Sequence, residues 1–178
     1  LLNRKPYGPG QHGQTRRRKP SNYAVQLRER QKIKFMYGLL EKQFRNTFKK
    51  AEKLKGETGT NMLQLLERRL DSIVYRLCFA PTRPAARQLV SHKHFLVNGK
   101  PVNIPSYLVK PGDIIEVKEK SKKMDIVLDA MRRIKGDIEL PWLELDKAKM
   151  SGTFIAVPER DQMNLNIKEQ LVVELYSK

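Results

Sequence analysis

The chain has 178 residues, and its 36 Lys and Arg against 19 Asp and Glu give a net charge of +17. This length suits one or two domains and excludes a large multidomain enzyme. Because like charges repel one another in a compact chain, the surplus favours a polyanionic partner, nucleic acid first and an anionic membrane second. No apolar run is long enough to span a bilayer. The single cysteine, Cys78, excludes an internal disulfide and suits a reducing compartment.

Residues 1–20 are predicted to form an extended basic arm. Residues 1–55 hold 16 of the basic residues but only 3 acidic ones. The segment 4–20 contains three Gly and three Pro and too few apolar side chains to offset the entropy of ordering. Aromatic rings between the charges could stack on unpaired bases while arginines contact phosphate, although a solubilising tail is the alternative. The candidate RNA-binding residues of the arm are Arg4, Lys5, Tyr7, His12, Arg16, Arg17, Arg18 and Lys19.

Residues 21–60 are predicted to form a helical subdomain, against which C-terminal segments pack. Ser21 or Asn22 can cap the first helix. The second runs from Glu41 to about Lys55, where Gly56 can end it. Its apolar residues recur at helical spacing, at Phe44, Phe48, Ala51 and Leu54. Arg30 and Lys32 of the first helix are candidate RNA-binding residues, and ordinary surface helices that carry long cationic side chains are a compatible alternative.

Residues 61–120 are predicted to form a separate module of helices and strands that begins with a helix over 61–79. One apolar stripe runs along it, through Leu63, Leu66, Leu70, Ile73, Val74 and Leu77. Arg68 is placed to pair with Asp71 three residues later. Arg69 and Arg76, on one flank of the helix, have no obvious local carboxylate. They are therefore candidates for binding RNA.

A second module helix is predicted from Thr82, a good N-cap, with Pro84 in the first turn. One face of this helix carries a set of four candidate residues, Arg83, Arg87, Ser91 and His94. No acidic residue occurs between positions 72 and 112, so nothing local offsets the repulsion of the two arginines. We expect both arginines to be exposed and to bind phosphate; a solvated basic face is the alternative.

The rest of the chain predicts an α+β fold with a small antiparallel sheet. Asn98-Gly99 between apolar runs is typical of a two-residue hairpin, which places Pro101 on an edge strand. A second turn is predicted at 110–113. Residues 121–178 should supply one helix, with apolar positions from Met124 to Ile134 and an end at Gly136. Short strands follow near 142–143, 154–157 and 171–173, and Trp142 should lie in the core.

The residues 66–115 as a whole resemble one known family. The run LERRLDSIVYRLCFAPTRPAARQLVSHKHFLVNGKPVNIPSYLVKPGDII is similar to the helix-helix-hairpin module named after small-subunit ribosomal protein four. This resemblance implies that residues 61–120 form an RNA-binding module. PYGPGQHG at 6–13, PWLELD at 141–146, GTFIAVPER at 152–160 and IKEQLVVELYSK at 167–178 resemble the same family. The resemblance covers nearly the whole chain in order and without a large insertion.

This resemblance implies a structural, non-enzymatic protein of the cytoplasmic ribosome. Such a protein binds a junction in the 5′ domain of small-subunit ribosomal RNA and nucleates subunit assembly. It contacts small-subunit protein five, contributes to translational accuracy and lies near the channel through which messenger RNA enters. Many bacterial relatives hold zinc with a cysteine cluster near the N-terminus, but Cys78 is the only cysteine here. We therefore expect no metal and no cofactor.

Two other classes of function remain as alternatives. The same module is appended to pseudouridine synthases and some aminoacyl-tRNA synthetases, but such an enzyme needs a separate catalytic domain, and only residues 121–178 follow the module. The sequence also shows no Cys–His or Ser–His–Asp arrangement. A membrane-surface protein is disfavoured because the amphipathic stretches lack a bulky apolar face with Trp or Phe.

Overall fold

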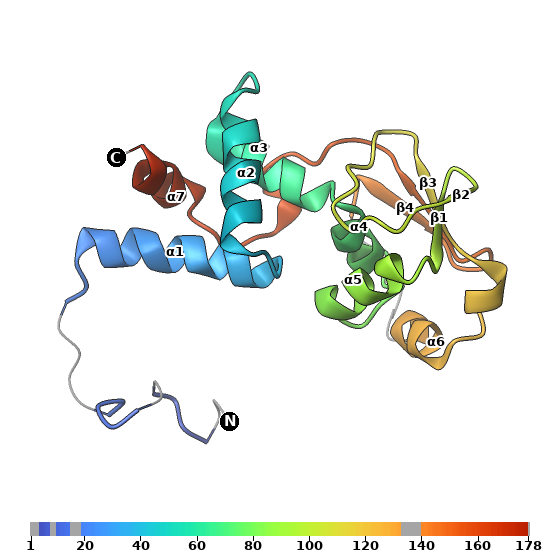
Figure 1. The fold of residues 1–178 in the computed structure, drawn as a ribbon, viewed down its shortest axis with the longest axis horizontal. Helices are drawn as coiled ribbons and strands as arrows, with labels where there is room; N and C mark the ends of the chain where they lie inside the picture. The colour runs from blue at the N-terminus through green and yellow to red at the C-terminus, as the bar shows by residue number, and fades with distance from the viewer. Residues whose placement is uncertain (1–3, 8–9, 15–18, 133–139, 178) are drawn as a thin grey trace.

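The computed structural model describes residues 4–7, 10–14, 19–132 and 140–177. These residues form an α+β fold with a five-stranded antiparallel sheet, which confirms the predicted fold class. Figure 1 shows two parts side by side: a helical part built from α1, α2, α3 and α7, and a second part in which α4, α5 and α6 lie beside the sheet.

The helical part consists of α1 (Asn22–Met36), α2 (Glu41–Glu52), α3 (Thr58–Glu67) and α7 (Glu169–Tyr176). The Ser21 hydroxyl caps α1 by accepting from the Ala24 N–H at 3.3 Å. In α2 the predicted residues Phe44, Phe48 and Ala51 are buried, but the helix ends before Leu54, which is half exposed.

The strand predicted at residues 171–173 is wrong, because these residues lie in α7. Val172, Val173 and Tyr176 all pack into the helical core, at a spacing that suits one face of a helix. A short apolar run does not by itself distinguish a strand from a buried helix, and here packing against α1 and α3 selects the helix.

The single helix predicted over residues 61–79 is also wrong, because the chain breaks between α3 and α4 (Leu70–Arg76). Arg69 adopts an extended conformation and forms a β-bridge with Leu108. Arg68 donates from Nε to the Val109 carbonyl at 3.1 Å instead of pairing with Asp71 as predicted. The loop that ends at Val109 thus supplies the partners that make the break possible.

This break divides the apolar stripe between two hydrophobic cores. Leu63 and Leu66 belong to the core of the helical part, whereas Leu70 and Ile73 belong to the core beneath the sheet. The boundary between the two hydrophobic cores therefore lies at residues 68–69. The division at residues 20, 60 and 120 remains a prediction from the sequence.

The second part begins with α4 and α5 (Arg83–Ser91) and continues into the sheet. Its strands are β1 (Phe95–Val97), β2 (Lys100–Pro101), β3 (Ile114–Val117), β4 (Leu143–Asp146) and β5 (Ser151–Phe154), in the order β2-β1-β3-β5-β4. Positive φ angles of 51° at Asn98 and 75° at Gly99 confirm the hairpin, and Pro101 lies on the edge strand as predicted.

The remaining C-terminal predictions have mixed outcomes. The run expected to be a strand over 154–157 supplies only its first residue, Phe154, to β5. Trp142 is buried in the core, as predicted. The predicted helix is α6 (Asp125–Arg132), while Ile134 and Gly136 lie outside the described residues. Two 3-10 turns, η1 (Glu119–Ser121) and η2 (Asp161–Met163), complete the described elements. Within the described ranges no helix has both the length and the apolar character needed to cross a membrane.

Candidate nucleic-acid interface

The described part of the N-terminal arm is exposed and contains neither helix nor strand. Arg4, Lys5, Tyr7, His12 and Lys19 all lie on the surface. Residues 10–14 form a turn in which the Gly13 N–H donates to the Gly10 carbonyl at 3.1 Å. The candidate residues Arg16, Arg17 and Arg18 lie outside the described residues. The arm therefore offers accessible cations and one accessible tyrosine ring to a partner.

The two candidates in α1 make contacts within the protein. The Nη2 atom of Arg30 lies 3.1 Å from a carboxylate oxygen of Glu41. The Arg30 guanidinium also lies 5.9 Å from the Tyr176 ring centroid. The Lys32 ammonium pairs with Glu29 at 3.2 Å and also donates to the Asn166 carbonyl. Arg30 and Lys32 thus help to join α1 to α2 and to the C-terminal segment.

A buried carboxylate, Glu67, lies between the two parts of the molecule. It accepts a bidentate pair of hydrogen bonds from Arg76, at 3.0 and 2.7 Å, and a third from the Tyr37 hydroxyl at 2.6 Å. Arg83 lies 3.5 Å away, and its guanidinium stands 4.6 Å from the ring centroids of both Tyr37 and Tyr75. Burial, together with the adjacent Glu67 charge, raises the pKa of Tyr37 well above its usual value, so the hydroxyl stays protonated and donates.

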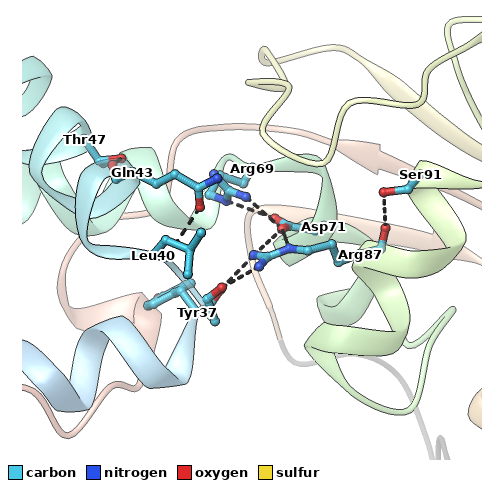
Figure 2. A network of polar contacts seen from close by, with 9 residues as sticks. Tyr37, Leu40, Gln43, Thr47, Arg69, Asp71, Arg87 and Ser91 are labelled. Carbon is cyan, nitrogen blue, oxygen red and sulfur yellow. Dashed lines mark hydrogen bonds and ion pairs between the residues drawn. The ribbon is translucent and has the colours of Figure 1, made fainter.

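A second buried carboxylate, Asp71, joins two more arginines (Figure 2). Arg69 binds it through Nε at 3.0 Å and Nη2 at 2.9 Å, and Arg87 binds it through the same two atoms at 3.0 and 2.8 Å. Arg87 also donates to the Tyr37 carbonyl at 3.0 Å and to the Gly38 carbonyl. Arg87 therefore connects α5 to the turn between α1 and α2.

These two networks correct the interpretation of the four module arginines. Arg69 and Arg76 were expected to lack a carboxylate, but Asp71 and Glu67 lie within hydrogen-bonding distance of them. Arg83 and Arg87 were expected to be exposed, but only 13% and 31% of their side-chain surface is accessible. Glu67 lies in α3 and Asp71 in α4. The pairings of Arg83 and Arg87 with them therefore could not be seen among the sequence neighbours of these two arginines. The structure brings the four arginines together as a structural cluster.

Ser91 is the last residue of α5, but the prediction that His94 shares its helix face is wrong, because the chain turns at Lys93, with a φ of 63°, and His94 lies between the helix and β1. The Ser91 hydroxyl donates to the Arg87 carbonyl one turn earlier at 2.9 Å. The Nδ1 atom of His94 lies 2.9 Å from the Ser121 hydroxyl. Partial burial lowers the pKa of His94, and the nearby positive charges of His92 and Lys118 lower it further.

We expect the His94 imidazole to titrate below about pH 6.5, the usual value for histidine. The unfolded chain then binds a proton at a higher pH than the folded one, so acidification from pH 7 through the native pKa should reduce stability through this group. Proton-detected NMR of the His94 ring measures the midpoint. Lys118→Ala should raise it and Lys149→Ala should not. A wild-type midpoint at or above 6.5 would contradict this expectation.

Accessible cations that were not among the predicted RNA-binding residues lie on α2. We call this set, Lys42, Arg45, Lys49 and Lys50, the α2 basic face. All four side chains are exposed, opposite the buried Phe44, Phe48 and Ala51. None of the four forms an ion pair with another described residue. The helical spacing of the buried residues is a signal that could have located this face.

Further exposed cations lie on the turns of the second part. Lys93 follows α5, Lys100 lies in the hairpin, and Lys110 begins the turn before β3. Their ammonium groups pair with no carboxylate in the described part of the chain. The described residues also contain no group of three or more His, Cys, Asp and Glu side chains that could hold a metal ion. The accessible chemistry is therefore cationic and hydrogen-bonding.

Comparisons with known proteins identify relatives over the whole chain. Residues 1–67 match the family model described as the ribosomal protein S4/S9 N-terminal domain, and residues 68–115 match the S4 domain. A protein of Parabacteroides distasonis is 58% identical over 178 residues, which cover 100% of this chain and 88% of the relative. A protein of Chlorobaculum tepidum is 57% identical over 99% of this chain and 87% of the relative. Both are named small ribosomal subunit protein uS4.

Proposed function

Because the chain belongs to the family of small ribosomal subunit protein uS4, we propose that it is a structural, RNA-binding component of the small ribosomal subunit. The observation that supports RNA binding most strongly is the position of the unpaired cationic side chains on the protein surface. Exposed cations without carboxylate partners in the described structure lie on the arm, the α2 basic face and the turns of the second part. A folded polyanion can contact several such groups at once.

The proposed mechanism is electrostatic and geometric. The accessible Lys and Arg side chains neutralise phosphates and release counterions, which supplies much of the binding free energy. The buried networks around Glu67 and Asp71 fix the two parts of the molecule relative to one another, so the cations are presented on a rigid surface. The arm, with Arg4, Lys5, Tyr7 and Lys19 exposed, becomes ordered on the RNA.

More specific roles follow from the family resemblance. The RNA is a junction in the 5′ domain of the small-subunit ribosomal RNA, and binding there nucleates subunit assembly in the cytoplasm. The bound protein contacts small-subunit protein five, influences translational accuracy and lies close to the incoming messenger RNA. A structural role of this kind requires neither catalysis nor a cofactor.

A salt titration tests the electrostatic mechanism. Each phosphate contact should contribute roughly −0.7 to −0.9 to the slope of log affinity against log salt concentration. Replacing Lys42, Arg45 and Lys49 together with Ala should therefore flatten the slope by about 2–3 if all three contact phosphate. The measurement is filter binding of the full chain to 5′-domain RNA at several salt concentrations.

A variant with the same loss of charge provides the control. Lys122, Arg132 and Lys149 are each already paired with a neighbouring carboxylate, at 2.5, 3.1 and 3.5 Å. Replacing these three with Ala should change the slope much less. A flat salt dependence of the wild-type protein would overturn the proposed function, and equal slopes for the two triple variants would exclude the α2 basic face as a phosphate-binding surface.

A further inference from the structure

A small pocket lies where the helical part meets the second part, beside the network shown in Figure 2. Its volume is about 190 Å³. Pockets for drug-sized ligands usually occupy roughly 300–1,000 Å³, so this one suits a single small planar group. The pocket is lined from α2, from the end of α3, from Arg69 and from the loop before β3, by Gln43, Asn46, Thr47, Lys50, Leu65, Arg69, Ser106 and Leu108.

The lining combines an apolar surface with unpaired polar groups. Leu65 is buried and Leu108 half-buried, and both contribute apolar atoms. The side chains of Asn46, Lys50 and Ser106 make no hydrogen bond or ion pair with any other residue that the structure describes. An amide, a hydroxyl and an ammonium group are therefore available beside an apolar wall.

The charge of the pocket distinguishes between possible occupants. Arg69 is buried, and its Nε and Nη2 atoms are already hydrogen-bonded to Asp71 at 3.0 and 2.9 Å. Lys50 is then the one lining cation without a carboxylate partner among the described residues. A free phosphate would not contact the apolar surface of Leu65 and Leu108 and would not need the Asn46 amide. A nucleobase, with apolar faces and a hydrogen-bonding edge, matches them, while its own phosphate can reach Lys50.

We propose that this pocket binds one unpaired base of the RNA. The base inserts against Leu65 and Leu108, its edge bonds to Asn46 and Ser106, and the adjacent phosphate pairs with Lys50. This inference rests on the proposed function. It adds a site that recognises an extruded nucleotide, whereas cations on the outer surface recognise only the path of the backbone.

The test compares two double variants of the full chain. Asn46→Ala with Ser106→Ala should weaken binding to 5′-domain RNA by roughly tenfold, because hydrogen bonding to one base edge contributes on the order of that factor. Chemical probing should show that one unpaired base loses its protection while the rest of the footprint remains. Asn22→Ala with Ser177→Ala replaces the same residue types away from the pocket and should leave affinity and footprint unchanged.

A photoreactive phenylalanine analogue in place of Ser106 supplies an independent measurement. It should crosslink to one unpaired nucleotide, the same one that loses protection in the pocket variant. Crosslinks spread along a duplex, or an unchanged footprint in Asn46→Ala with Ser106→Ala, would overturn the pocket assignment while wild-type RNA binding upheld the proposed function. If the wild-type protein does not bind the RNA, the proposed function itself fails.

Discussion

Glu67→Ala should destabilise the protein by about 3–5 kcal/mol, the usual effect of removing one partner from a buried ion pair. The carboxylate is fully buried and accepts hydrogen bonds from both Arg76 and Tyr37, with Arg83 close by. Without it, the largely buried guanidinium groups of Arg76 and Arg83 lose their shared counter-charge. Glu67→Gln keeps a hydrogen-bond acceptor but no charge, so its effect should be smaller than that of Glu67→Ala.

Urea unfolding followed by circular dichroism measures this difference. The matched control is Glu119→Ala, which removes a carboxylate that pairs with Lys122 but is 86% exposed. Exposed pairs contribute roughly 0–1 kcal/mol, so the control should unfold close to the wild type. Equal unfolding midpoints for Glu67→Ala and Glu119→Ala would show that the buried network contributes little to stability.

The double variant Arg83→Ala with Arg87→Ala should lose stability by about 3–5 kcal/mol rather than fail only in RNA binding. The sequence predicted that the fold would survive this change because both side chains were expected to be exposed. In the structure Arg83 lies between two tyrosine rings beside Glu67, and Arg87 joins Asp71 to the turn after α1. Removing both weakens the connection between the two parts of the molecule.

A control with the same change in charge separates stability from RNA affinity. Arg28 and Arg45 are exposed and unpaired within the described structure, so Arg28→Ala with Arg45→Ala should leave stability within about 0.5 kcal/mol of the wild type. It should still weaken RNA binding through the lost charge. The opposite pattern, wild-type stability with reduced affinity in the Arg83–Arg87 variant, would restore the interpretation that these arginines contact RNA.

The two buried networks have a common consequence for the architecture. Tyr37, at the end of α1, donates its hydroxyl to Glu67, and its carbonyl accepts from Arg87 of α5. The same residue thus contacts both networks and links the helical core to the core beneath the sheet. Hydrogen bonds to charged groups are about twice as strong as neutral ones, so these contacts suit a rigid junction between the two parts.

Local signals in the sequence were sufficient wherever the chain's immediate neighbours decide the conformation. Ser21 and Thr82 cap helices because their hydroxyl groups accept from N–H groups three residues later. Asn98-Gly99 forms its hairpin because both residues adopt positive φ angles. The burial of Phe44, Phe48 and Ala51 follows from their helical spacing. The family was recognisable for a related reason, because its motifs are contiguous and keep their order.

Tertiary structure decided which partners the arginines have within the protein, the helix break at Arg69 and the conformation of residues 171–173. Each depends on groups distant in sequence: Glu67 and Asp71 reach the arginines of α5, Leu108 pairs with Arg69, and α1 packs on α7. A net charge of +17 follows from the sequence alone and indicates a polyanionic partner. The fold determines which of those charges remain available to that partner. A guanidinium group that is already paired with a buried carboxylate binds a phosphate less strongly than an unpaired one.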